Sequence, residues 1–266
     1  MNNVSPLFPD SGGNFQRYGN FRPNGDNDAL ISTSAPRIPW PVFIERLTWN
    51  QGEHVGLIGP TGQGKTTLLT SLLDQRTYVA LFATKPRDPS MDYLISQGYM
   101  KLERWENYAP RKFPKRVIWP NATDIESEDL QKHVFDNAFK SIYRETGWCI
   151  VLDEGYYVSK VLQLGNRMRT IWTQGRSLGI SFVVATQRPR WVPLEMYDQS
   201  THLFFWREND DDNLSRIGGM GAAPSRLVRE IVANLDVYQT LYVNTRTGEM
   251  MRTKAPAPRY NIGGES

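Results

Sequence analysis

The sequence predicts an α/β protein with a mostly parallel central sheet, helices on both of its faces and a C-terminal β-hairpin. Three observations lead to this fold class. From residue 42 onward, short apolar runs alternate with helical patterns. A glycine-rich loop at 59–66 separates an apolar run from a helical pattern, and two further apolar runs lie within 237–253. Alternation of strands and helices is typical of a parallel sheet that is covered on both faces.

The individual elements follow from hydrophobic periodicity and from the turns between the runs. The first two strands are expected at 43–48 and 54–58, around a turn at 50–52. Short and uniformly apolar runs, such as 148–152, are typical of strands buried in a parallel sheet. The other predicted strands are 78–83, 116–119, 148–152, 180–185, 203–206 and a pair within 237–253. The predicted helices are 65–74, 91–97, 127–145, 158–177 and 225–235.

The composition is that of an ordinary globular protein. With 266 residues, of which 39% are hydrophobic and 22% charged, the chain can bury one large core. These values exclude collagen-like, coiled-coil and fully disordered structures. The single cysteine, Cys149, excludes an intramolecular disulfide framework and a multi-cysteine metal site. Since no apolar run approaches the roughly 18 residues that span a bilayer, we expect a cytoplasmic protein without a membrane anchor.

The first 36 residues differ from the remainder in composition. Asn, Gly, Pro and Ser occupy 18 of these 36 positions. Such a segment has too little apolar surface to offset the entropy that ordering would cost. We therefore divide the chain into a disordered or docking arm at 1–36, an α/β domain at 37–254 and a tail at 255–266.

Residues 59–66 match the phosphate-binding pattern G-x-x-x-x-G-K-[ST] at every fixed position. The match follows an apolar run and opens a helical pattern, which is the context that a phosphate loop requires. The glycines let the backbone curl so that its N–H groups point at phosphate oxygens. Lys65 is expected to reach the β- and γ-phosphates, and the Thr66 hydroxyl to ligate Mg²⁺. The predicted nucleotide-binding residues are Gly59, Pro60, Thr61, Gly62, Gln63, Gly64, Lys65, Thr66 and Thr67.

Two carboxylates end the apolar run at 149–152. At the carboxyl end of a strand, Asp153 can hold Mg²⁺, and Glu154 can polarise the water that attacks the γ-phosphate. A buried strand that ends in two acids by chance is the alternative, but the phosphate loop upstream favours a catalytic pair. The sequence thus predicts ATP and Mg²⁺ as ligands.

Gln187 and Arg176 complete the catalytic candidates. Gln187 follows the next buried strand, so we expect it beside Glu154 at the same sheet edge, where ligands bind in α/β folds. Its amide can contact the γ-phosphate and the attacking water. Arg176 has two open interpretations. Its guanidinium could reach the γ-phosphate of a neighbouring subunit and stabilise transition-state charge, or it could be a helix-end arginine that faces the helix dipole.

Together these motifs resemble those of the HerA/FtsK superfamily of DNA-pumping ATPases. The similarity covers roughly residues 45–245 and includes the phosphate loop, the pair of carboxylates and the segments 175–180 and 185–189. It implies a RecA-like P-loop NTPase domain, ATP and Mg²⁺, a ring that is usually hexameric, and double-stranded DNA moving through its centre. The residues that match functional positions of that family are Lys65, Thr66, Asp153, Glu154, Arg176 and Gln187.

The resemblance implies an ATP-driven translocase of double-stranded DNA. In size the chain resembles a minimal motor, so we expect genome packaging or DNA transfer by a phage or mobile element. A portal, a capsid or a recruiting protein would then be a partner. One alternative is a nucleotide-gated assembly protein that binds ATP to oligomerise without pumping DNA. Another is an ABC-type ATPase, although residues 137–144 contain no L-S-G-G-Q-like run before the second motif.

A basic segment is the main candidate for contact with DNA. Six basic residues lie between positions 101 and 116, interleaved with Trp105, Tyr108 and Phe113. Phosphates attract the cations and aromatic rings can stack on bases, although a solvated basic face would show the same composition. Lys160 lies in the segment after the carboxylate pair, where a loop could couple hydrolysis to DNA. The predicted DNA contacts are Arg104, Arg111, Lys112, Lys115, Arg116 and Lys160.

Overall fold

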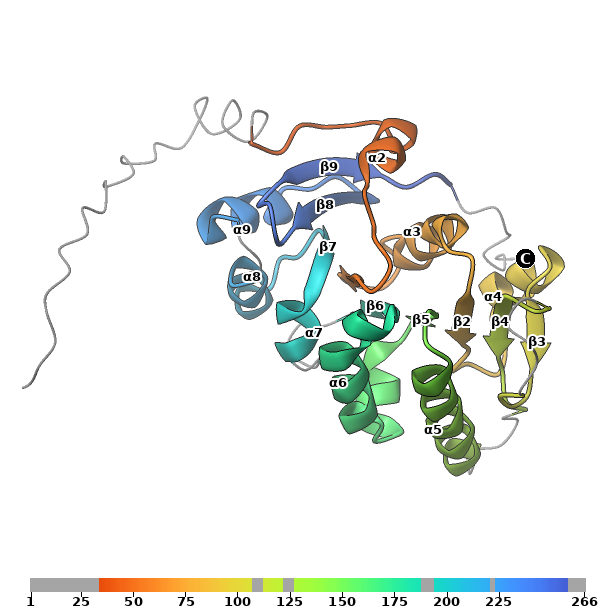
Figure 1. Ribbon diagram of the computed structural model, residues 1–266. Coiled ribbons are helices and arrows are strands. Elements are labelled where there is room, and N and C mark those ends of the chain that lie inside the picture. The colour runs from red at the N-terminus through yellow and green to blue at the C-terminus, as the bar shows by residue number, and fades with distance from the viewer. Residues whose placement is uncertain (1–33, 107–111, 122–126, 188–193, 221–222, 258–266) are drawn as a thin grey trace, which may run out of the picture.

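A nine-stranded sheet forms the centre of the molecule (Figure 1). The structure is a computed structural model that describes residues 34–106, 112–121, 127–187, 194–220 and 223–257. The strand order is β3-β4-β2-β5-β6-β1-β7-β8-β9. The strands are β1 His54–Ile58, β2 Val79–Phe82, β3 Met100–Leu102, β4 Lys115–Ile118, β5 Cys149–Leu152, β6 Ser181–Thr186, β7 Ser200–Trp206, β8 Gln239–Asn244 and β9 Met250–Lys254. The α-helices are α2 Trp40–Arg46, α3 Lys65–Leu72, α4 Pro89–Ser96, α5 Glu128–Glu145, α6 Gly165–Gln174, α7 Leu194–Asp198, α8 Asp211–Gly218 and α9 Ser225–Ala233.

Strand direction gives the sheet two distinct edges. In the described part of the chain, the first seven strands of the sheet order given above run parallel to one another, from β3 at the edge of the sheet to β7. The strands β8 and β9 extend the sheet as the predicted antiparallel hairpin. All seven parallel strands end at one edge, which we call the carboxyl edge. The start of β8 lies at the same edge because Thr240 pairs with Trp206 at the end of β7. The opposite edge is the amino edge.

Helices cover both faces of the sheet, as the sequence predicts. The helices α2, α3 and α4 contribute Phe43, Leu68 and Met91 to the hydrophobic core on one face. The helices α5 and α6 contribute Phe135 and Ile171 to the core on the other face, and Figure 1 shows these two helices below the sheet. The inner strands β1, β2, β5 and β6 are buried along their whole length. Burial on both faces explains why these strands are continuous apolar runs instead of alternating patterns.

The strand predicted at 43–48 is wrong, because α2 occupies most of this segment. Pro41 lies in the first turn of α2, where its fixed φ suits a helix and its missing N–H is not needed. Phe43 is the buried residue of the helix. A short run with a single buried anchor has no clear period, so the apolar pattern alone did not distinguish a helix from a strand.

The single helix predicted at 158–177 is also wrong. A π-helical turn at Tyr157–Val161 comes first, and α6 begins after it. Between the two, Gln163 has a φ of 55°, a left-handed conformation that interrupts a helix. The segment ends in a 3₁₀ turn at Gly175–Leu178. The short elements β3, α7 and α8 have no counterpart among the predicted elements.

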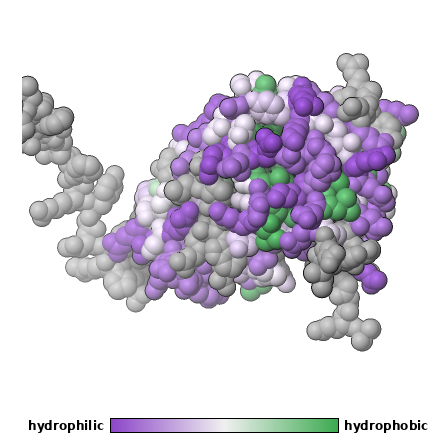
Figure 2. Space-filling view, turned by 90° about the horizontal axis from the view of Figure 1, so that it is seen from below, coloured by the Kyte–Doolittle hydropathy of each residue, from purple (hydrophilic) through white to green (hydrophobic). Residues whose placement is uncertain are grey.

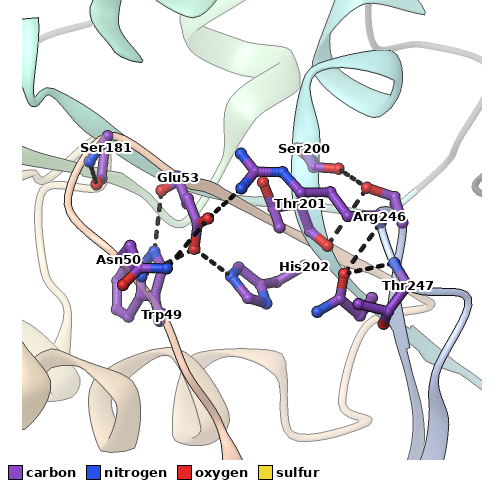
Figure 3. Close-up of polar contacts among 12 residues, drawn as sticks. Trp49, Asn50, Glu53, Ser181, Ser200, Thr201, His202, Arg246 and Thr247 are labelled. Atoms are coloured by element: carbon purple, nitrogen blue, oxygen red, sulfur yellow. Dashed lines mark hydrogen bonds and ion pairs between the residues drawn. The ribbon is translucent and has the colours of Figure 1, made fainter. Parts of the chain in front are cut away.

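A buried carboxylate anchors the amino end of β1, the strand that leads to the phosphate loop (Figure 3). Glu53 accepts hydrogen bonds from the backbone N–H of Asn50 (2.8 Å), from Nε2 of His202 on β7 (3.1 Å) and from Arg246 after β8 (2.6 Å). Burial acts to raise the pKa of Glu53, but the hydrogen bonds from Asn50 and His202 outweigh it and lower the pKa. Glu53 therefore ties the start of β1 to β7 and to the β8–β9 hairpin.

His54 fixes β1 against the strand on its other side. Its Nδ1 accepts the backbone N–H of Phe182 on β6 (3.0 Å), and its Nε2 donates to the carbonyl of Trp172 on α6 (3.0 Å). Burial lowers the pKa of His54 to about 4, so the ring is neutral near pH 7, as this donor–acceptor pattern requires. The strands β1 and β6, whose carboxyl ends carry site residues, are thus held in one register.

The surface is mainly hydrophilic where Figure 2 shows it, on the side of α5 and α6, and apolar residues form only small patches there. Within the described ranges, no helix has both the length and the apolar character needed to cross a bilayer. Among the described residues, the large apolar side chains with the highest exposure are Val237 (57%) and Tyr238 (49%), which are adjacent in the sequence just before β8.

Candidate nucleotide site

The phosphate loop connects β1 to α3 at the carboxyl edge, as predicted. Gly64 is the residue before α3 and has a φ of 90°, a conformation that residues with a Cβ rarely adopt. The Lys65 side chain turns back into the loop, and its Nζ donates to the carbonyls of Gly59 and Pro60, both at 2.7 Å. Thr67 is buried. Gly59 is buried as well, whereas the remaining loop residues are at least partly accessible: Pro60, Thr61, Gly62, Gln63, Gly64 and Thr66.

Burial lowers the pKa of Lys65, while the negative charges of Asp153 and Glu154 act in the opposite direction. The residue is only 9% exposed. Within the loop, the ammonium group donates hydrogen bonds to two neutral carbonyls. No negatively charged group of the loop therefore balances its charge. A phosphate chain in the loop would supply that counter-charge.

The structure brings Thr66 and Asp153 together, although 87 positions separate them in the sequence. The Thr66 hydroxyl lies 3.0 Å from each oxygen of the Asp153 carboxylate. Burial raises the pKa of Asp153, and the positive charge of Lys85 opposes this shift. The two side chains meet because β5 ends at the same edge at which the loop enters α3.

This pair fits Mg²⁺. A hydroxyl oxygen and a carboxylate oxygen are the hard ligands that Mg²⁺ prefers, and the ion commonly takes only one or two protein ligands beside phosphate oxygens and water. A bound ion at Asp153 would also offset the burial of a carboxylate that has only partial compensation from its neighbours. Thr66 and Asp153 are therefore the residues that would hold the ion.

Glu154 and Gln187 lie side by side at the carboxyl edge. The Gln187 side chain donates from Nε2 to Oε2 of Glu154 at 3.1 Å. Since β6 lies between β5 and β1 in the sheet, Gln187 lies between the carboxylate pair and the phosphate loop. Burial and the negative charge of Asp153 raise the pKa of Glu154. A raised pKa makes this carboxylate a better proton acceptor than an exposed one.

The backbone at Gly155, directly after Glu154, is in close contact with β6. A Cβ added at Gly155 would lie 2.3 Å from Cγ1 of Val184 and 3.3 Å from the carbonyl oxygen of Ala185. A glycine is therefore required at this position, because any side chain would push β5 and β6 apart. The close approach fixes Glu154 relative to the end of β6.

Lys85 is a site residue that sequence reasoning missed. It follows β2, the neighbour of β5, and its Nζ lies 3.9 Å from Oδ2 of Asp153 and 3.8 Å from Oδ2 of Asp88. The side chain is 56% exposed, so we regard it as a mobile cation near the predicted Mg²⁺ site. The signal that could have revealed it is a basic residue at the carboxyl end of a strand next to the carboxylate strand.

Arg176 lies away from this cluster. It belongs to the 3₁₀ turn at Gly175–Leu178, which precedes β6 and therefore lies at the amino edge. The carbonyl oxygen of Arg176 would be 2.7 Å from a Cβ at Gly52, just before β1, which confirms this location. Its side chain is exposed. Arg176 therefore lies at the opposite edge from the phosphate loop of its own chain, so any contact with a γ-phosphate would have to be made in another subunit.

The prediction that Arg116 contacts DNA is wrong. Its side chain is completely buried between two aromatic rings, with the guanidinium carbon 4.4 Å from the ring centroid of Trp105 and 4.6 Å from that of Trp148. It also donates to the backbone carbonyls of Phe113 and Glu106. A guanidinium enclosed in this way stabilises the core by cation–π contact and is not available to phosphates.

The other predicted DNA contacts are divided between the two edges. Lys112 and Lys115 lie before or at the start of β4, and so at the amino edge. Lys160 lies in the π-helical turn after β5, on the carboxyl side of the sheet, and is exposed. Arg104 is also exposed, but its neighbour Trp105 packs against Trp148, which precedes β5, so the chain turns back toward the amino edge at this point. Arg111 lies outside the described residues. The basic segment is therefore not one continuous face.

No protein-family model matches the sequence, and no curated protein matches it. Solved structures do match. The DNA-packaging ATPase B204 from Sulfolobus Turreted Icosahedral Virus is 15% identical, with a TM-score of 0.56 over 78% of this chain and 100% of that chain. The genome packaging NTPase B204 from Sulfolobus turreted icosahedral virus 2, solved in complex with ATP-gammaS, is 15% identical, with a TM-score of 0.54 over 77% and 98%.

VirB4 of Thermoanaerobacter pseudethanolicus is similar as well. It is 12% identical, with a TM-score of 0.55 over 79% of this chain and 90% of that chain. At these identities the likeness concerns the arrangement of the backbone, and it extends over most of each chain. The mostly parallel sheet with helices on both faces is thus an arrangement that this chain shares with the two viral packaging proteins and with VirB4, and the predicted fold class is confirmed.

Proposed function

We propose that this chain is an ATPase that binds ATP with Mg²⁺, hydrolyses it, and uses the reaction to move double-stranded DNA. One observation carries the proposal: Thr66, Asp153, Glu154 and Gln187 meet at the carboxyl edge beside the Lys65 loop. Phosphate-binding, cation-binding and water-activating groups are thus brought to one point by three neighbouring strands. The fold shared with two viral packaging ATPases supports genome packaging or transfer as the process.

Each residue has a separate part in the reaction. Lys65 and the backbone N–H groups of the loop hold the phosphate chain, and Thr66 and Asp153 hold Mg²⁺, which when bound neutralises charge on the phosphate oxygens. Glu154 orients a water and accepts its proton as the water oxygen bonds to the γ-phosphorus. The bond from the γ-phosphorus to the bridging oxygen breaks, and ADP leaves. Gln187, bonded to Glu154, lies where its amide can contact the γ-phosphate and the water.

The ring is the second part of the proposal. Because Arg176 lies at the amino edge, it can serve only a neighbour's site, where its guanidinium would stabilise charge on the transferred phosphoryl group. The exposed side chain of Lys160 is the described DNA candidate that lies on the carboxyl side of the sheet. A homo-oligomer of six subunits and a portal, capsid or recruiting protein are the partners that this proposal includes.

DNA is expected to stimulate the steady-state hydrolysis of ATP. A motor that holds any sequence grips DNA through phosphates, so the stimulation should fall as salt is raised and counterion release becomes less favourable. The measurement compares phosphate release with and without long double-stranded DNA, with Glu154→Gln as the inactive control. A rate of hydrolysis that DNA does not change at low salt would favour the nucleotide-gated assembly protein. The next step would then be to identify the protein partner of that assembly.

Arg176→Ala is expected to abolish hydrolysis in a uniform assembly and to be complemented by mixing. A Glu154→Gln subunit retains Arg176, and an Arg176→Ala subunit retains Glu154, so some mixed interfaces contain both groups. Activity should therefore appear on mixing two inactive variants. Arg169→Ala, on the exposed surface of α6, is the matched control and should stay active. If hybrids form and no mixing ratio restores hydrolysis, Arg176 does not act between subunits.

A further inference from the structure

An exposed aromatic ring lies next to the phosphate loop. Tyr238 immediately precedes β8, so it lies at the carboxyl edge, where β1 delivers the loop. Its Cδ1 is 3.6 Å from the position that a Cβ on Gly64 would occupy. Among the described residues, Tyr238 is the side chain that lies within 4 Å of that position. Tyr238 is thus in van der Waals reach of the residue that opens α3, although 174 positions separate the two in the sequence.

The sheet order shows which part of a nucleotide would lie on this side. Glu154 and Gln187 follow β5 and β6, on one side of β1, so the γ-phosphate end of ATP must point toward those strands. The strands β7 and β8 lie on the other side of β1. A phosphate chain that runs through the loop therefore leaves its ribose and base on the side of β7 and β8, where Tyr238 lies.

The conformation of Tyr238 is unusual for its residue type. Its φ is 63°, in the left-handed region that an aromatic residue seldom adopts. The residue is 49% exposed even though Nζ of Lys254 lies 5.4 Å from the centroid of its ring. Its neighbour Val237 is 57% exposed. A strained backbone that holds an apolar ring in solvent is a pattern found at ligand sites, where the strain is part of the arrangement.

A cavity is lined by residues on both sides of Tyr238 in the sequence. A cavity of about 480 Å³ lies beside the turn, lined among others by Trp40, Val237 and Lys254. This volume is in the range of sites for small organic ligands. The same Lys254 contacts the Tyr238 ring, so the cavity and the ring belong to one surface.

From these observations we infer that Tyr238 is the base-binding residue of the site: its ring stacks on the adenine of ATP whose phosphates lie in the 59–66 loop. The inference rests on the proposed function, because it assumes a nucleotide in the loop. It adds the part of the site that recognises the nucleoside, which neither the phosphate loop nor the carboxylates supply. A stacking ring contacts the face of the base and not the hydrogen-bonding groups on its edge. Tyr238 therefore provides affinity for any nucleotide base.

The test separates binding of the base from binding of the phosphates. Calorimetric titration with ATPγS measures both, and titration with inorganic tripolyphosphate measures the phosphate part alone. Tyr238→Gly removes the ring and suits a positive φ, so its unfolding temperature should be no lower than that of the wild type. Tyr238→Phe keeps the ring and is the matched control.

Tyr238→Gly is expected to weaken ATPγS binding about tenfold, the usual effect of losing one base–aromatic stack, and to leave tripolyphosphate binding unchanged. Tyr238→Phe should bind both ligands like the wild type. Unchanged ATPγS affinity in Tyr238→Gly would overturn the inference, and so would an equal loss for both ligands, which would mean that the ring only supports the loop. A wild-type protein that binds neither ligand would instead contradict the proposed function itself.

Discussion

Replacing Glu154 with glutamine is expected to abolish ATP hydrolysis while ATP still binds. The substitution keeps the size of the side chain and its contact with Gln187, but it removes the proton acceptor. A general base contributes a factor of about 10² to 10⁴ to a rate, so kcat should fall by that amount. The phosphate loop and the Thr66–Asp153 pair are untouched, which is why the affinity for ATP should remain close to that of the wild type.

Single-turnover hydrolysis and equilibrium binding of ATP check this result on the same preparation. Glu45→Gln, on the exposed surface of α2, is the matched control, because it makes the same chemical change away from the carboxyl edge. It should hydrolyse ATP like the wild type. If Glu154→Gln retained normal turnover, the attacking water would have to be activated by another group, and the assignment of Glu154 would fail.

Lys65→Ala is expected to remove nucleotide binding almost completely. In the structure the ammonium group is held within the loop by the carbonyls of Gly59 and Pro60, so it is already placed where phosphates would lie. Truncating one partner of a buried, hydrogen-bonded charge pair costs about 2–5 kcal/mol, so the Kd for ATP should rise by a factor of about 30 to several thousand. The loss should be equally severe for tripolyphosphate, because Lys65 acts on the phosphates and not on the base.

Thermal unfolding with and without Mg²⁺–ATP distinguishes this effect from a folding defect. Binding to the native state raises the unfolding temperature of the wild type, whereas Lys65→Ala should show the same temperature with and without ATP. Lys140→Ala on α5, which removes a partly exposed cation, should retain the shift. A Lys65→Ala protein that is stabilised by ATP as strongly as the wild type would contradict the predicted role of the loop.

The sequence alone predicted those features of the structure that depend on the local order of residues. The spacing of glycines and of Lys65 requires a curled loop between a strand and a helix, and the structure shows that loop. The position of Gln187 beside Glu154 could also be predicted, because parallel strands end at a common edge and each residue directly follows a buried strand. For the same reason the sheet with helices on both faces was predictable, including its C-terminal hairpin.

What the sequence could not predict depends on contacts between distant segments. Arg116 stands in a basic stretch that looks solvated, yet it is enclosed by Trp105 and by Trp148, which comes from the start of another strand. Lys85 and Tyr238 reach the site only because β2 and β8 take particular places in the sheet order. The helix α2 lies where a strand was expected. The prediction failed because a short segment with one buried residue shows no clear hydrophobic period.

Gly155 has a consequence for how the site can respond to its ligand. Because the backbone there is in close contact with Val184 and Ala185 of β6, the strand ends that carry the acid and the amide are held at a fixed separation. We therefore expect backbone movement after phosphate release to occur beyond Gly155, in the π-helical turn at Tyr157–Val161, which carries the exposed Lys160.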